Sequence, residues 1–171
     1  MSKLDFNIFL IGFMGSGKST IARQLKKELD MELVEMDQRI VDEQGMSIND
    51  IFAQKGEEAF RDIESQLVVD LGNQEASIIS CGGGVVIRPQ NVENMKKSGK
   101  IVFLTASPET ILERVKGGTD RPLLNGNMNV PYIKEMMDKR RDFYEGAADI
   151  KISTDNKSVK EISTEIIEAL K

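Results

Sequence analysis

The 171-residue sequence contains no histidine and only one cysteine, Cys81. The missing histidine removes the commonest general base and the commonest metal ligand in proteins. Any proton transfer therefore falls to a carboxylate. A single cysteine excludes an internal disulfide and a CxxC site, and we expect Cys81 to be a small buried apolar side chain rather than a reactive thiol.

Long apolar runs and a basic surplus are also missing. The formal net charge is −5 and the sequence pI is about 5.0. Binding to nucleic acid or to an anionic membrane would need a basic surface, so we expect neither. No stretch approaches the length of a membrane span, and the N-terminus lacks a signal-peptide pattern, which favours the cytoplasm. We expect residues 1–171 to form a single domain, acting as a monomer.

A glycine-rich stretch near the N-terminus carries the most specific motif. Residues Gly12–Ser19, GFMGSGKS, match the pattern GxxxxGK[ST]. The stretch follows the apolar run Ile8–Ile11 and precedes a helical pattern, which is the context in which this motif binds nucleoside triphosphates. The alternative is a glycine-rich turn with a chance lysine, and the complete match in the right context favours the nucleotide site.

The residue types explain how such a loop would hold a polyphosphate. Glycines let the backbone come close to an anion, and the N–H groups of Gly15, Ser16 and Gly17 would point at it, aided by the N-terminus of the next helix. Lys18 would reach the β- and γ-phosphates. The Ser19 hydroxyl would bind the Mg²⁺ that bridges them.

The rest of the chain alternates strand and helix patterns. Strands are predicted at 8–11, 31–34, 76–81, 101–104 and 150–153, and helices from near 18 to 30 and at 37–44, 47–55, 57–71, 89–97, 108–115, 130–144 and from 158. This order predicts a three-layer α/β/α P-loop NTPase domain with a five-stranded parallel sheet. Gly12, Glu35 and Gly82 should meet in one crevice at the carboxyl ends of the strands. Residues 116–129 show no period, and we interpret them as a mobile lid.

Two arginines lie at unusual positions on predicted helices. Arg140 falls within the apolar stripe of the helix at 130–144, so its charge must be paired, by a core carboxylate or by a carboxylate or phosphate of a ligand. Arg61 and Glu64 lie together on the flank of another helix. From spacing alone, a solvated surface pair is the simpler interpretation of these two.

Carboxylates and glycines follow the predicted strands. Glu35 and Asp37 can project on the same side of the chain, one supporting Mg²⁺ and the other accepting a hydrogen bond from an attacking hydroxyl. Asp37 could instead be a helix N-cap. Gly82–Gly84 indicate a close approach to the backbone, either by a substrate or within a tight turn.

Taken together, these residues resemble the shikimate kinase family of small P-loop phosphotransferases. The resemblance extends nearly from end to end, and its order and spacing are more specific than any motif after the P-loop. It is carried by Gly12–Thr20, Met36-Asp37 with Ile40, Phe60-Arg61 with Ile63-Glu64, the triple glycine, Arg121-Pro122-Leu123-Leu124, and Arg140 with Tyr144.

The resemblance implies transfer of the γ-phosphoryl group of ATP to the 3-hydroxyl of shikimate, with Mg²⁺ as cofactor, in aromatic amino-acid biosynthesis. Lys18, Asp37 and Arg121 would be catalytic. The ATP-site residues that it implies are Gly15, Ser16, Gly17, Lys18, Ser19, Thr20, Arg114 and Arg121. Of these, Arg114 would stack on adenine and Arg121 would lie in the lid. Its implied shikimate-site residues are Asp37, Phe60, Arg61, Gly82, Gly83, Gly84 and Arg140, with Arg61 and Arg140 on the carboxylate.

One residue departs from the family pattern, and two rival functions stay open. Glu35 stands where the family usually has an aspartate, so its place beside Ser19 in the metal shell is an expectation only. A kinase of the same fold for another small acid, such as gluconate, would share the P-loop but gives no comparable reason for Phe60-Arg61. A non-catalytic nucleotide-binding module need not keep Lys18 or Asp37.

Overall fold

The computed structural model describes residues 4–13, 15–115 and 129–171, and its centre is a five-stranded parallel sheet. The strand order is β2-β3-β1-β4-β5 and every neighbouring pair is parallel. The strands are β1 (Asn7–Ile11), β2 (Glu32–Glu35), β3 (Ser77–Ser80), β4 (Gly99–Thr105) and β5 (Ile150–Ser153). The predicted α/β fold with five parallel strands is confirmed.

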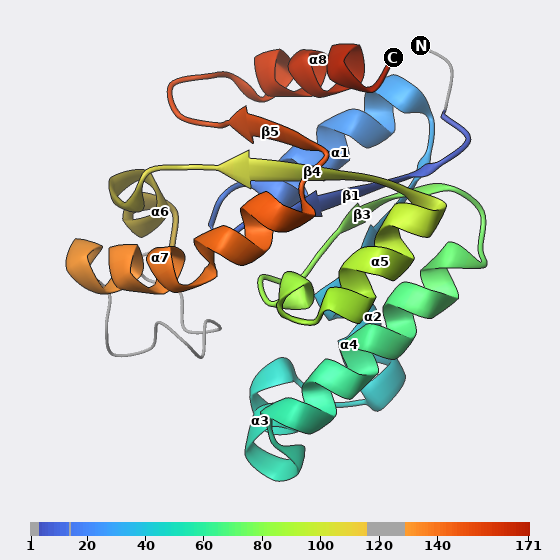
Figure 1. Ribbon diagram of the computed structural model, residues 1–171, viewed down its shortest axis with the longest axis vertical. Coiled ribbons are helices and arrows are strands. Elements are labelled where there is room, and N and C mark those ends of the chain that lie inside the picture. Colours follow the sequence, from blue (N-terminus) through green and yellow to red (C-terminus); the bar gives the residue numbers. More distant parts are fainter. Residues whose placement is uncertain (1–3, 14, 116–128) are drawn as a thin grey trace.

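Helices connect the strands and cover both faces of the sheet. They are α1 (Lys18–Leu29), α2 (Met36–Gln44), α3 (Ile48–Lys55), α4 (Glu57–Gly72), α5 (Pro89–Ser98), α6 (Pro108–Val115), α7 (Val130–Ala147) and α8 (Val159–Leu170), with a short 3₁₀ helix η1 (Val85–Ile87). Figure 1 shows α1 and α8 on one side of the sheet and α4, α5 and α7 on the other. No helix in the described ranges has the length and apolar character needed to cross a membrane.

Most predicted elements agree with the structure to within a few residues. The capping box that opens α8 is present, with Ser158 accepting from the Glu161 N–H and Glu161 accepting from the Ser158 N–H. Three differences concern local details. Helix α7 continues to Ala147, η1 was not predicted, and Asp37 is the second residue of α2 rather than its N-cap, a position that Glu35 occupies.

Alternate side chains of β1 enter the two apolar layers. Ile8 and Leu10 pack in the cluster formed with α1 and α8, whereas Phe9 and Ile11 pack in the cluster formed with α2, α3, α4, α5 and α7. All five residues of β1 are buried, because helices cover both faces of a parallel sheet. The central strand is therefore held from both sides, and the loop that follows it starts from a fixed point.

A buried asparagine fixes the amino end of β1. The Asn7 side-chain oxygen accepts from the Ser77 N–H at 2.8 Å, and its amide nitrogen donates to the Leu71 carbonyl at 3.3 Å and to Ser98 Oγ at 3.1 Å. Both the oxygen and the nitrogen of the Asn7 side-chain amide thus form hydrogen bonds, although the residue is only 3% exposed. These bonds join β1, β3, α4 and α5 at the end of the sheet opposite the glycine-rich loops.

The predicted lid at 116–129 lies almost wholly outside the described residues, and so does Arg121. Asn129 is described, and its side chain accepts from the Tyr132 N–H as the N-cap of α7.

Replacing Gly99 by alanine should destabilise the sheet. A Cβ at Gly99 would lie 2.0 Å from the Asn7 carbonyl oxygen, a backbone atom that can move only by separating β1 from β4. We expect the free energy of unfolding, measured by urea denaturation, to fall by roughly 1–3 kcal/mol.

Gly146→Ala provides the matched control. Nothing lies within 4 Å of a Cβ at this exposed position in α7, so alanine should raise the free energy of unfolding by roughly 0.5–1 kcal/mol. Equal stability of the two variants would contradict this account of the β1–β4 contact.

Candidate active site

A cleft of about 420 Å³ lies at the carboxyl ends of the strands. The predicted site residues that line it come from segments far apart in the sequence: Gly15, Gly17, Lys18, Ser19, Thr20, Glu35, Asp37, Phe60, Arg61, Gly82, Gly83, Gly84, Arg114 and Arg140. Ser16 is buried below this surface, with 1% of its area exposed. Of the predicted site residues only Arg121 lies outside the described ranges.

The P-loop wraps around the N-terminus of α1. Gly17 has φ 99° and Gly15 has φ 81°, conformations that side-chain-bearing residues rarely adopt. Lys18 begins the helix, and its Nζ donates to the carbonyl oxygens of Gly12 at 2.6 Å and Phe13 at 3.2 Å. The ammonium group therefore lies inside the loop, next to the N–H groups at the helix start, in the position where a phosphate would meet both.

Ser19 and Glu35 form the oxygen-rich corner of the cleft. Ser19 Oγ donates to Glu35 Oε2 at 2.9 Å and lies 3.4 Å from Ser80 Oγ. These side chains come from α1, from the end of β2 and from the end of β3, so the parallel sheet itself brings them together. The longer glutamate side chain reaches the P-loop serine. No cluster of three or more acidic, cysteine or histidine side chains suited to a metal occurs in the described part of the chain.

Asp37 lies beside the glycine loop in the middle of the cleft. A Cβ built on Gly82 would come within 3.0 Å of Asp37 Oδ1 and within 2.8 Å of Glu64 Oε2. Two carboxylates from α2 and α4 thus converge on one backbone position. Only glycine leaves the space between them open.

The interpretation of Arg61 and Glu64 as a solvated surface pair is wrong. Arg61 is 8% exposed and Glu64 is fully buried, and Arg61 Nη1 donates to Glu64 Oε1 at 3.0 Å. Helical periodicity places both on the flank of α4, but α2 and the glycine loop cover that flank. Arg61 also reaches Glu57 at 3.5 Å and lies 5.3 Å from the centre of the Phe60 ring.

Burial changes the acid–base properties of Glu64. Loss of solvation raises the pKa of this carboxyl to about 7, while the Arg61 guanidinium opposes the rise and the Asp37 carboxylate adds to it. Both protonation states are therefore populated near neutral pH. Burial also raises the pKa of the Cys81 thiol, so this buried cysteine stays protonated, as predicted.

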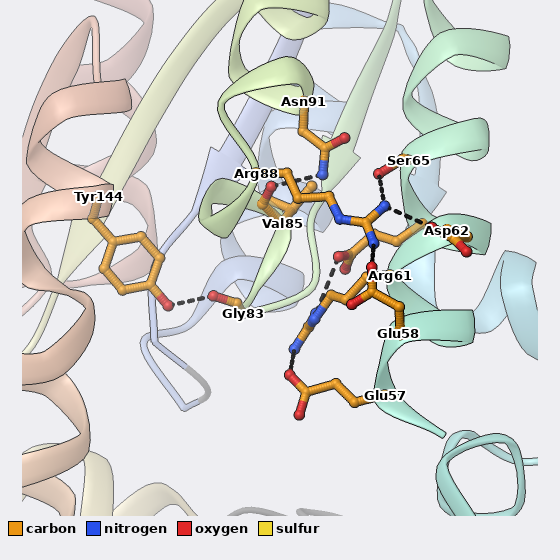
Figure 2. A network of polar contacts seen from close by, with 11 residues as sticks. Glu57, Glu58, Arg61, Asp62, Ser65, Gly83, Val85, Arg88, Asn91 and Tyr144 are labelled. Atoms are coloured by element: carbon orange, nitrogen blue, oxygen red, sulfur yellow. Dashed lines mark hydrogen bonds and ion pairs between the residues drawn. The ribbon is translucent and has the colours of Figure 1, made fainter. Parts of the chain in front are cut away.

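The glycine loop passes between the two arginines. A Cβ on Gly84 would lie 2.4 Å from Arg61 Nη1, and a Cβ on Gly83 would lie 3.2 Å from Arg140 Nη1. The loop is fixed by Tyr144, whose hydroxyl donates to the Gly83 carbonyl at 2.5 Å, as Figure 2 shows. The glycines therefore allow both guanidinium groups to approach the backbone.

Arg140 faces the cleft from α7, as its place in the apolar stripe predicts. It is 8% exposed, and no carboxylate within the described ranges forms an ion pair with it. The alternative of a structural salt bridge to a core carboxylate therefore receives no support from the geometry. The described neighbours that interact with its charge include Glu64 and Tyr144.

Two further residues fix the segment that follows the glycine loop and were not identified from the sequence. Arg88 follows η1 and forms ion pairs with Glu58 at 2.8 Å and Asp62 at 2.9 Å on α4, shown in Figure 2. Asn91 donates to the Val85 carbonyl at 2.9 Å. Asn91 shares the buried side of α5 with Met95, a helical spacing that could have revealed it, whereas no local pattern indicates the partners of Arg88.

Arg114 lies over the P-loop at the other end of the cleft. Its Nη1 donates to the Gly15 carbonyl at 3.0 Å and lies 3.4 Å from Thr154 Oγ1 in the segment after β5. The Ser107 N–H donates to the Asp155 carboxylate at 3.0 Å, which joins the same segment to the start of α6. The cleft is thus anionic in the centre and carries guanidinium groups at both ends.

Comparisons with known proteins agree with this geometry. The sequence model of the family described as shikimate kinase matches residues 14–171. The shikimate kinase of Sulfurihydrogenibium sp. is 41% identical over 165 residues, covering 96% of this chain and 98% of that protein. The one from Bacillus mycoides is 44% identical over 160 residues, covering 94% and 95%.

Solved structures give the same result. Shikimate kinase from Acinetobacter baumannii in complex with shikimate superposes with a TM-score of 0.90 at 29% identity, covering 95% of this chain and 91% of the other. A gluconokinase from Sinorhizobium meliloti superposes with a TM-score of 0.62 at 17% identity, covering 98% and 93%, which shows a shared fold alone. This chain belongs to the shikimate kinase family.

Proposed function

We propose that this protein transfers the γ-phosphoryl group of ATP to the 3-hydroxyl of shikimate, giving shikimate 3-phosphate and ADP in aromatic amino-acid biosynthesis. One observation carries the assignment of the acceptor end. Two buried guanidinium groups, Arg61 and Arg140, flank a bare glycine backbone in the cleft. A small hydroxylated carboxylic acid supplies the anion that this pair requires.

The acceptor end would position the substrate through charge and shape. Arg61 and Arg140 hold its carboxylate, and the backbone of Gly82–Gly84, with Phe60 beside it, receives its ring. Asp37 accepts a hydrogen bond from the reacting hydroxyl and takes its proton as phosphoryl transfer proceeds. This assignment agrees with the absence of histidine, which leaves a carboxylate for the proton.

The nucleotide end would hold the phosphates through the P-loop. Backbone N–H groups of the segment from Gly15 to Thr20 cradle them, and Lys18 offsets the charge that develops on the transferring group. Arg114 would stack on adenine, and its contacts with Gly15 and with Thr154 after β5 support this role. Arg121, outside the described residues, would add a second positive charge at the phosphates.

The oxygen-rich corner suits Mg²⁺ as the cofactor. This ion keeps most of its waters and takes only one or two protein oxygens together with phosphate oxygens, so a sparse set of donors fits it. Ser19 and, directly or through water, Glu35 would hold it, and it would neutralise part of the phosphate charge. The Ser19–Glu35 distance of 2.9 Å supports this pairing.

We also propose that residues 1–171 work as one domain, as a monomer in the cytoplasm, without binding nucleic acid or membrane. The two main apolar clusters lie on the two faces of one sheet, which supports a single domain. The net charge of −5 supports the absence of polyanionic partners.

The direct test is ADP release by the purified protein with Mg-ATP and one of two acids. We expect release with shikimate and none above background with gluconate or without an acceptor, because the chain belongs to the shikimate kinase family and shares only its fold with the gluconokinase. Turnover with gluconate alone would contradict the assignment of the acceptor end. Tight ATP binding without turnover on either acid would contradict catalysis itself.

Substitutions at the two ends of the cleft should affect different kinetic constants. Lys18→Ala removes charge stabilisation in the transition state, so kcat should fall by about 10²–10³-fold. Arg140→Ala removes one charge-assisted contact to the acceptor, so KM for shikimate should rise about 10–100-fold with a smaller change in KM for ATP. Steady-state kinetics with each substrate varied would measure both effects.

Arg141→Ala is the matched control for Arg140→Ala. Arg141 is the next residue of α7, but its side chain is 56% exposed and pairs with Asp138 outside the acceptor end of the cleft. Its kinetic constants should equal those of the unaltered protein. The role of Arg140 would be refuted by equal shikimate KM values in the Arg140→Ala and Arg141→Ala variants.

A further inference from the structure

Glu64 is a buried acid whose second oxygen faces the acceptor end of the cleft. Its Oε1 accepts from Arg61 at 3.0 Å, and its Oε2 has no hydrogen-bond partner within the described ranges. The residue has no exposed surface. A buried carboxylate oxygen without a donor is costly, and protonation lowers this cost when an acceptor such as Asp37 lies near the new O–H group.

The surroundings of Glu64 hold charges of both signs. Asp37 Oδ1 and Glu64 Oε2 lie 3.0 Å and 2.8 Å from the Cβ position of Gly82. Among the described residues, the titratable and charged groups around Glu64 are Arg61 and, through it, Glu57 on α4, Asp37 on α2, Cys81 after β3, and Arg140 and Tyr144 on α7. Burial and Asp37 favour the neutral acid, whereas the two arginines favour the carboxylate.

Binding of an acidic acceptor changes this balance in one direction. The carboxylate of the acceptor would contact Arg61 and Arg140, the two cations that stabilise ionised Glu64. It adds an anion to a cleft that already holds Asp37, and it binds the two guanidinium groups whose positive charge otherwise stabilises ionised Glu64. The neutral form of Glu64 is therefore favoured more strongly in the complex than in the free protein.

We propose that Glu64 takes up one proton from solvent when the acceptor carboxylate binds to Arg61 and Arg140, so that this residue sets how acceptor affinity depends on pH. The inference rests on the proposed function. The step is a single proton transfer, in which a buffer acid gives up a proton and the Glu64 carboxylate becomes a carboxylic acid. The proton on Oε2 supplies a donor in the space beside Gly82, facing Asp37.

Proton uptake can be measured directly by isothermal titration calorimetry. Shikimate is titrated into the full chain in two buffers of equal pH and different ionisation enthalpy. Free Glu64 is mostly protonated at about pH 6, since its pKa is about 7, so uptake there should be near zero. Uptake should rise toward one proton at about pH 8, and the affinity should fall by up to about tenfold per pH unit above pH 7.

Two variants separate Glu64 from the other acid beside Arg61. Glu64→Gln keeps the shape of the side chain but cannot take up the proton, so its uptake should be zero and its affinity constant between about pH 6 and pH 8. Glu57→Gln is the control, because Glu57 is 58% exposed and touches the same guanidinium at 3.5 Å. It should retain the uptake of the unaltered protein.

The possible outcomes are distinguishable. Shikimate binding without proton uptake at about pH 8, or uptake that persists in Glu64→Gln, would overturn the inference and leave the proposed function intact. Failure of shikimate to bind the unaltered protein at any pH would overturn both. The measurement on the unaltered protein does not depend on whether the variant folds.

Titration of Glu64 should also make the free energy of unfolding depend on pH. Because the pKa of Glu64 rises from 4.5 to about 7 on folding, the native state binds its proton more tightly than the unfolded state. Its contribution to the free energy of unfolding therefore falls as pH rises through this window. Urea denaturation at about pH 5 and pH 7.5 should show a larger decrease for the unaltered protein than for Glu64→Gln, and equal decreases would contradict the titration.

Discussion

The charge balance around the glycine loop is the constraint on which the acceptor end depends. Arg61, Glu64 and Arg140 are all nearly or fully buried, and their charged groups lie close to the backbone at 82–84. Burying three charges is costly unless each finds a partner. Arg61 and Glu64 form an ion pair, and Arg140 forms none with a described carboxylate, although its charge also favours ionised Glu64. The proposed binding of a substrate carboxylate depends on these two guanidinium groups.

The scaffold around this cluster keeps its geometry. Tyr144 fixes the Gly83 carbonyl, Asn91 fixes the Val85 carbonyl, and Arg88 ties the segment after the loop to α4. These contacts come from α7, α5 and the segment between η1 and α5, so three elements hold one short loop. A rigid loop without side chains lets the guanidinium groups approach to contact distance. Preorganisation of this kind reduces the ordering that a ligand must impose.

The two ends of the cleft are connected through the parallel sheet. The P-loop follows β1, Glu35 ends β2, and the glycine loop follows β3, and these three strands are neighbours in the order β2-β3-β1. The separation of the P-loop and the glycine loop is therefore set by strand spacing, whereas Arg61 and Arg140 reach the glycine loop from α4 and α7. A kinase needs that precision, because its catalysis consists largely of positioning and charge stabilisation.

The sequence by itself determined the P-loop, the alternation of strands and helices in an α/β domain and the inward face of Arg140, because each depends on contacts within one or two turns or on periodicity. Only the tertiary structure decided the burial of Arg61 and Glu64. Their spacing also fits an exposed pair. They are covered by α2 and by the glycine loop at 82–84, about 20 residues away in the sequence. The same holds for Arg88, whose partners lie on another helix. Local patterns specify which face of a helix is apolar, but the energies of buried charges depend on neighbours that only the fold supplies.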